Sequence, residues 1–243
     1  MHTKLLFSGA LLTAALAAPA AFAVGGGIPF VFREGNVPGG TQPNPVVADS
    51  EDLTYHACGA FVVADSNVAR GSFWVASYQD AVGGVDSQIN FIGAAGYNVY
   101  GIFRLAADEC MGPQPTCNNL TRRSYGVTAG QIELFLDPAA DTVLGLAGCQ
   151  VAVAGNGDDT SLGMAPAIIS GQITETNDQA NGDFDVIFAN WAFTAAGQQL
   201  YRDGNNNPLA AQILQLNANV TRLQGPLSND HRPEGSGNFF WVD

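Results

Sequence analysis

The chain has 243 residues, with 22 acidic side chains against nine basic ones and a formal net charge of −13. Such an acidic surface repels nucleic acid and anionic lipid, so neither is an expected partner, whereas divalent cations are attracted to it. The length suits one large β domain better than two small domains.

Residues 1–23 have the pattern of a secretion signal. Lys4 supplies the positive start, and the apolar run Leu5–Ala17 that follows is too short to span a bilayer. Ala21-Phe22-Ala23 matches the small-residue cleavage pattern. We therefore expect a secreted, extracellular protein, located at the cell surface or in the matrix. It has no membrane span, and residues 24–243 form a single β-sandwich domain.

Short segments of alternating polarity predict an all-β chain. The clearest is Gln131–Leu136, which ends at Asp137-Pro138 because proline has no amide hydrogen for a sheet ladder. One face of this strand would carry Ile132, Leu134 and Leu136. Further strands are predicted at Ile28–Phe32, Leu53–Ala64, Gly71–Tyr78, Ile89–Ile92, Tyr97–Leu105, Ala147–Ala154, Ile168–Thr174, Asp183–Asn190, Gln212–Leu223 and Asn238–Asp243.

Segments rich in glycine, proline and polar residues predict the connections. Thr41–Asp52 is expected to be an extended surface connection, Ala106–Arg123 a loop, and Pro226–Gly237 a loose segment. Thr194–Tyr201 predicts one or two helical turns, and the chain shows no long amphipathic helix. About ten short strands at near-even spacing predict an antiparallel β-sandwich, with a barrel or jelly roll as the alternative.

Four cysteines follow the secretion signal: Cys58, Cys110, Cys117 and Cys149. An even number of cysteines in an oxidising compartment suggests two disulfides, for which three pairings are possible. The prolines between Cys110 and Cys117 make that stretch turn, so a local bridge between them is the first choice. Cys58 would then pair with Cys149. The cysteine spacing is not that of a zinc site.

Two acidic turns are candidate calcium sites, and no other cofactor is expected. The run Asp203–Asn207 places oxygen-bearing side chains at alternate positions, which makes Asp203, Asn205 and Asn207 candidate ligands. The EF-hand pattern is not completed, because Leu214 stands where a glutamate belongs. Asp137 and Asp141 form the second candidate, and Asp158-Asp159 is a looser one. Plain turns are the alternative, since Asn, Asp and Gly favour turns for conformational reasons.

We expect no catalytic residues. The sequence lacks the Gly-x-Ser-x-Gly elbow of serine hydrolases, and only His56 and His231 follow the secretion signal. Glu133 with the aspartates after it, Asp137 and Asp141, is the best carboxyl set for a glycoside-active enzyme, although acids in a solvated strand and turn are commoner. The tryptophans, Trp74, Trp191 and Trp241, are expected in the core rather than in a sugar-stacking platform.

Three groups of segments, in this order, resemble the flocculation-associated PEP-CTERM exported proteins of Gram-negative bacteria. They are Phe32–Gly39 with Val47–Asp49; Gly96–Phe103 with Ile132–Pro138 and Asp141-Thr142; and Gly182–Val186 with Thr194–Gln198. The resemblance covers nearly all of the chain after the signal. It implies an exported surface or matrix protein linked to aggregation and exopolysaccharide, without catalytic residues. The family's C-terminal sorting tail, a Val-Pro-Glu-Pro motif followed by an apolar helix and a basic cluster, is not seen in this sequence.

We therefore expect a secreted, non-enzymatic matrix or cell-aggregation protein of flocs or biofilms. It would bind extracellular polysaccharide or a cell surface through many weak contacts, or assemble with itself. Strand edges such as Gln212–Leu223 could pair between copies. A carbohydrate-binding module is the main alternative, and a secreted glycoside-active enzyme is less favoured.

Overall fold

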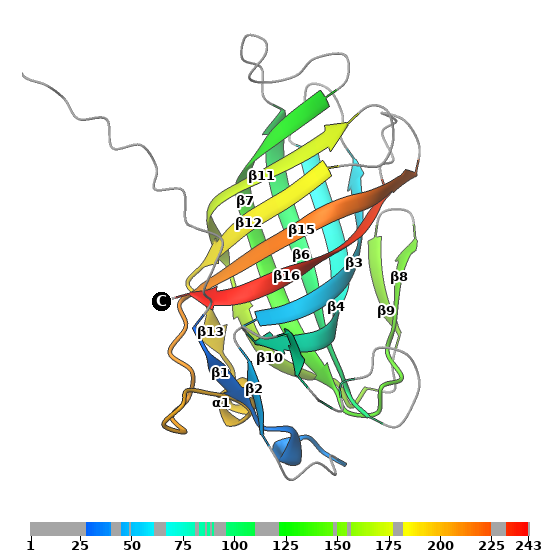
Figure 1. Ribbon diagram of the computed structural model, residues 1–243. Helices are drawn as coiled ribbons and strands as arrows, with labels where there is room; N and C mark the ends of the chain where they lie inside the picture. The colour runs from blue at the N-terminus through cyan, green and yellow to red at the C-terminus, as the bar shows by residue number, and fades with distance from the viewer. Residues whose placement is uncertain are drawn as a thin grey trace, which may run out of the picture.

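The computed structural model shows a chain built mainly from antiparallel β-strands (Figure 1). It describes residues 28–39, 45–48, 50–60, 67–80, 83–85, 87, 89, 96–109, 122–147, 150–154, 157–176, 182–224 and 232–242. The predicted secretion signal lies outside these ranges. The expected all-β antiparallel fold with short helical turns is confirmed. None of the helices in the described part of the chain has the length and apolar character needed to cross a membrane.

The described strands are β1 (Phe30–Phe32), β2 (Val46–Ala48), β3 (Ser50–Ala60), β4 (Asn67–Asp80), β5 (Gly83–Val85), β6 (Asn98–Glu109), β7 (Arg122–Asp137), β8 (Val143–Ala147), β9 (Gln150–Ala154), β10 (Thr160–Ala165), β11 (Ala167–Thr176), β12 (Gly182–Ala189), β13 (Ala192–Phe193), β14 (Tyr201–Arg202), β15 (Ile213–Gln224) and β16 (Arg232–Val242). A 3-10 helix, η1 (Glu34–Asn36), follows β1, and one short α-helix, α1 (Ala195–Leu200), precedes β14.

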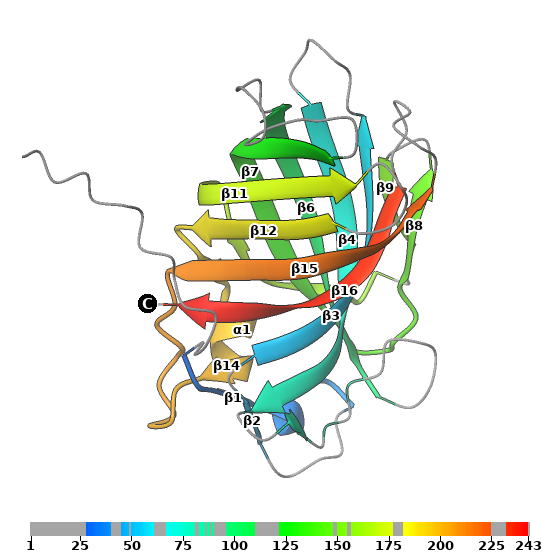
Figure 2. The same cartoon turned by 45° about the horizontal axis from the view of Figure 1, so that its top comes forward.

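Most of the long strands belong to one curved sheet. From β7 the hydrogen-bonded order runs through β11, β12, β15, β16, β3, β4 and β6 and returns to β7, with antiparallel pairing throughout. The sheet returns to its start because β7 is long. Its first part, Arg122–Gly126, pairs with β11, and Ile132–Leu136 pairs with β10. Figure 2 shows β11, β12, β15 and β16 forming one wall with β6 and β4 behind them, so two walls of this sheet face each other as the layers of a sandwich do.

The inner face of this sheet carries the core. Phe73 and Val75 of β4 and Ile132 and Leu134 of β7 are fully buried, as the alternation of the sequence predicts. Trp74, which alternates with Phe73 along β4, is half-buried. The period of two therefore identifies the core face of both strands correctly.

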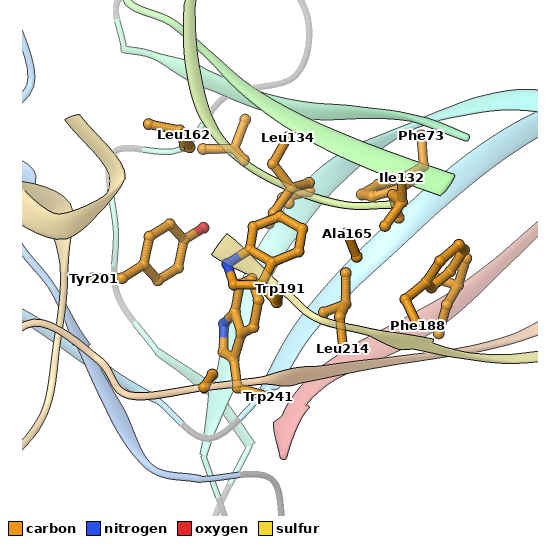
Figure 3. Packing of buried hydrophobic residues seen from close by; sticks show 14 of the residues in the cluster. Phe73, Ile132, Leu134, Leu162, Ala165, Phe188, Trp191, Tyr201, Leu214 and Trp241 are labelled. Atoms are coloured by element: carbon orange, nitrogen blue, oxygen red, sulfur yellow. The ribbon is translucent and has the colours of Figure 1, made fainter. Parts of the chain in front are cut away.

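Two of the three tryptophans pack against each other inside this core (Figure 3). The rings of Trp191 and Trp241 lie edge to face with their centroids 4.8 Å apart, and Trp241 is fully buried. Phe193 packs on both rings. The prediction that tryptophan serves the core is confirmed for Trp191 and Trp241.

A second, smaller sheet closes one end of the core. It consists of β14, β1 and β2, and both of its ladders are antiparallel. Phe30 and Phe32 of β1 are buried against an aromatic group from the other elements, formed by Tyr78, Tyr97 and Tyr201. The aromatic contacts attach the N-terminal segment to the main sheet.

Helix α1 confirms the helical turns predicted over Thr194–Tyr201. Thr194 caps it, because its side-chain oxygen accepts a hydrogen bond from the amide of Gly197 at 3.2 Å. The amide of Thr194 donates to the carbonyl of Leu162 at 2.9 Å. The first turn of the helix is thereby held directly against β10.

A buried acid lies beside this aromatic group. Glu34 of η1 is 1% exposed, and the hydroxyl of Tyr97 donates to its Oε1 at 2.7 Å. Because an ionisable side chain is costly to bury without hydrogen-bond donors, we expect Tyr97→Phe to lower the free energy of unfolding by about 1–2 kcal/mol. Chemical denaturation of the purified protein measures the change. A variant as stable as the parent would show that this hydrogen bond contributes nothing.

Two strand predictions need correction. The sequence predicts a loose segment over Pro226–Gly237, but β16 begins at Arg232, so the prediction is wrong for residues 232–237. Strands β15 and β3 pair with β16 on its two sides, and these ladders outweigh the weak strand preference of proline and glycine. The predicted connection Thr41–Asp52 contains β2 and the start of β3 among its described residues.

Other differences concern boundaries. The single strand predicted over Ala147–Ala154 is instead divided between β8 and β9, which pair with each other; the mainly apolar sequence from Val143 to Ala154 does not mark the division. The predicted loop Ala106–Arg123 overlaps β6, which runs to Glu109, and β7, which begins at Arg122; the residues between these strands lie outside the described ranges. Strands β5 and β10 are not predicted. Within Ile89–Ile92, Ile89 forms an isolated bridge and the other residues lie outside the described ranges.

Candidate functional site

Three carboxylates meet where β7 ends and β10 begins. Asp137 is the last residue of β7, Asp141 lies in the turn after it, and Asp158 shortly precedes β10. One oxygen from each carboxylate lies within 4.8 Å of the others. Asp137 is fully buried, whereas Asp141 and Asp158 are exposed. We call these three residues the acidic cluster.

The turn after β7 is built around the Asp137 carboxylate. Its Oδ1 accepts a hydrogen bond from the amide of Ala139 at 3.1 Å, and its Oδ2 accepts one from the amide of Thr142 at 2.8 Å. Ala140 has φ of 54°, in the left-handed region that a tight turn requires. These bonds fold the chain back so that Asp141 lies next to Asp137.

Sheet pairing brings the third carboxylate. Leu136 of β7 pairs with Thr160 of β10, so the residues just before Thr160 lie beside the end of β7. Asp159 is fastened there by the hydroxyl of Tyr100, which donates to its Oδ2 at 3.0 Å, and by the hydroxyl of Thr142, which donates at 3.0 Å. The neighbouring Asp158 is thereby fixed close to the turn.

The electrostatics of this region are those of crowded anions. Burial raises the pKa of Asp159, the hydrogen bonds from Thr142 and Tyr100 oppose this shift, and the charges of Asp137 and Asp158 add to it. Burial, and next the charge of Asp159, also raise the pKa of the Tyr100 hydroxyl. A cation placed among these groups would relieve the repulsion between them.

Asn98 lies next to the acidic cluster. It is the first residue of β6 and pairs directly with Asp137 across the ladder, so the two side chains are on the same face of the sheet, about 4.5–5.5 Å apart at Cβ. Its neighbours Tyr97 and Val99 face the core, which places Asn98 on the opposite face. Asn98 is nevertheless 1% exposed, and neither its Nδ2 nor its Oδ1 has a hydrogen-bond partner.

Glu133, the acid favoured for a glycoside-active enzyme, lies on the same face of β7 but outside the acidic cluster. Its Oε1 accepts a hydrogen bond from the hydroxyl of Ser161 on β10 at 2.8 Å. Phe135, two residues further along, stacks on Tyr100 with ring centroids 5.1 Å apart. This part of the face is occupied by contacts between strands.

The second calcium candidate is a turn that satisfies its own carboxylate. Oδ1 of Asp203 accepts hydrogen bonds from the amides of Asn205 at 2.9 Å and Asn207 at 2.7 Å, and Oδ2 accepts one from Nδ2 of Asn207 at 3.1 Å. The bonds from Asn207 are the main reason that the pKa of Asp203 is lowered. Oδ1 of Asn206 accepts from the Arg33 guanidinium at 2.6 Å. These bonds are those expected of a plain turn.

The two calcium candidates predicted from the sequence therefore differ in the structure. It joins Asp137 and Asp141 to Asp158, whereas Asp203, Asn205 and Asn207 stay in a separate turn. The contribution of Asn98 was not anticipated, because a polar residue on the outer face of a strand is normally solvated. The Asp158-Asp159 pair is a looser candidate in the sequence, and the structure places Asp158 with Asp137 and Asp141.

The cysteine pairing stays a prediction. Cys58 lies on β3, while Cys110, Cys117 and Cys149 are outside the described residues.

Comparison with protein-family models, curated proteins and solved structures found no match to this chain.

Proposed function

We propose that the protein is a secreted, non-enzymatic matrix or cell-aggregation protein that binds extracellular polysaccharide or a cell surface by many weak contacts. The observation that carries the proposal is the acidic cluster, with Asp141 and Asp158 exposed on a chain of net charge −13. Divalent cations can link such carboxylates to an anionic polymer, and repetition of weak links raises apparent affinity by a factor of about 10² to 10⁴. The resemblance to flocculation-associated exported proteins points the same way.

The placement of the aromatic residues favours this function over a carbohydrate-binding module. A sugar platform needs exposed rings in a row. Trp191 and Trp241 are instead buried in the core. Trp74 pairs with Tyr100, and Tyr100 pairs with Phe135, so these three do form a row across β4, β6 and β7. The central ring, Tyr100, is only 2% exposed, which removes the middle of such a platform.

One part of the expected mechanism is wrong. The sequence suggests that the edge of Gln212–Leu223 pairs between copies. The structure shows that Ile213–Val220 of β15 is paired on both sides, with β12 and with β16. The backbone groups of that stretch are therefore already used within the chain, and it does not offer a free edge to a second copy.

The experiment is a settling assay with a strain that lacks the gene. We expect slower settling of its cells, restoration by added purified protein when calcium is present, and no restoration when a chelator is present. An unrelated protein of similar net charge serves as the control for a general charge effect. Normal flocs and an unchanged matrix in the deletion strain would contradict the proposal. Sugar release from a polysaccharide, abolished by Glu133→Gln, would replace it with a glycoside-active enzyme.

A further inference from the structure

We infer that the acidic cluster and Asn98 together form a calcium site that fastens the connection between β7 and β10 to the outer face of the sheet. Asp137, Asp141 and Asp158 supply the carboxylates, and Asn98 supplies an amide oxygen. The inference rests on the proposed function in one respect only, which is that a bound ion would face an anionic polymer. Calcium binding itself is a property of the purified chain.

The donor set is what calcium requires. Calcium takes six to eight oxygen ligands at about 2.3–2.6 Å, from carboxylates, amide or backbone carbonyls and water, in flexible geometry. Three carboxylate oxygens within 4.8 Å of one another can surround one such ion with small side-chain rotations. The exposure of Asp141 and Asp158 leaves room for water or an anionic ligand on the outer side.

Asn98 is the second, independent observation. A buried amide without hydrogen-bond partners costs about 1–3 kcal/mol, and buried polar groups are nearly always satisfied. The ladder pairing places the Asn98 side chain beside Asp137, on the face where the acidic cluster gathers. An ion held by the cluster would give the Asn98 carbonyl oxygen a partner in the very place where it now has none.

The site would join segments that are distant in sequence. Asn98 belongs to β6 and Asp137 to β7, whereas Asp158 ends the connection that carries the hairpin of β8 and β9. That hairpin contacts β3 and β4. A cation bound at the two ends of the connection would hold both to the same pair of strands, β6 and β7.

The test is thermal unfolding of the purified chain with calcium chloride, with magnesium chloride and with a chelator. We expect calcium to raise the melting temperature, the chelator to reverse the rise, and magnesium to act more weakly because it prefers rigid octahedral sites. Asp158→Asn and Asp141→Asn, both at exposed positions, are expected to remove most of the calcium-dependent rise. Asp203→Asn, which changes the charge equally in the separate turn, is expected to retain it.

The variant Asn98→Leu tests whether Asn98 is a calcium ligand or only a buried amide without a hydrogen-bond partner. In chelator the variant is expected to be as stable as the parent or more stable, because an unpaired buried amide has been removed. In calcium it is expected to show a smaller rise than the parent. No calcium-dependent rise in the parent, or an equal loss in Asp203→Asn and Asp158→Asn, would overturn the inference. A calcium rise that needs Asp158, together with normal flocs in the deletion strain, would refute only the proposed function.

Discussion

Phe32→Ala is expected to lower the free energy of unfolding by about 3–5 kcal/mol, the largest effect of a single substitution that we predict. Phe32 is fully buried and stacks on Tyr78 and Tyr97, with centroid distances of 5.1 and 5.6 Å. It also meets Tyr201 edge to face at 5.0 Å. Truncation would remove three ring contacts at once and leave a cavity where the small sheet joins the main one. Equilibrium denaturation by guanidinium measures the loss.

Ile169→Ala is the matched control for Phe32→Ala. Ile169 is also a large apolar residue in a strand, but it is 56% exposed. Its truncation should change stability by no more than about 0.5 kcal/mol. Equal effects of the two substitutions would mean that the aromatic group around Phe32 does not stabilise the fold.

Gly197→Ala is expected to destabilise the protein by about 1–3 kcal/mol or more, although alanine is the better helix former by about 1 kcal/mol. Gly197 lies in the first turn of α1, and a Cβ there would overlap the backbone carbonyl of Leu162. That carbonyl cannot easily move, because it accepts the hydrogen bond from the amide of Thr194. The helix would have to lift away from β10.

Gly204→Ala provides the control for Gly197→Ala. A Cβ at Gly204 would meet nothing within 4 Å. We expect this substitution to change the melting temperature little, whereas Gly197→Ala lowers it clearly. A Gly197→Ala variant that is more stable than the parent would show that helix propensity outweighs the close approach of α1 to β10.

The sequence predicts strands well where one face is buried and the other is not. Gln131–Leu136 shows a period of two because Ile132 and Leu134 meet the core while Gln131 meets solvent. The same signal is weak at Arg232–Gly237, where pairing with two neighbouring strands decides the structure and local preference does not. It also fails to mark the division between β8 and β9, because the sequence from Val143 to Ala154 is mainly apolar and shows no alternation there.

The candidate site also has a part that the sequence predicts and a part that it does not. Asp137 and Asp141 are close in sequence, and a turn after proline suffices to predict that they are near each other. Asp158 reaches them only through the pairing of β7 with β10, and Asn98 through the pairing of β6 with β7. The register of these strand pairs depends on the whole sheet, and the spacing of residues along the sequence does not predict it. The approach of Asp158 and Asn98 to Asp137 and Asp141 therefore could not be predicted from the sequence.

The pairing of β3 with β16 sets the order in which the molecule can be completed. Strand β3 lies early in the chain, whereas β16 comes after all of the other described strands. Until β16 has been synthesised, β3 lacks one of its two neighbours, and its backbone groups on that side can pair with any extended chain nearby. Bringing two such distant segments together also carries a large entropic cost, which slows folding. Until β16 is in place the sheet cannot close, so the free side of β3 is where an incompletely folded chain would associate with another.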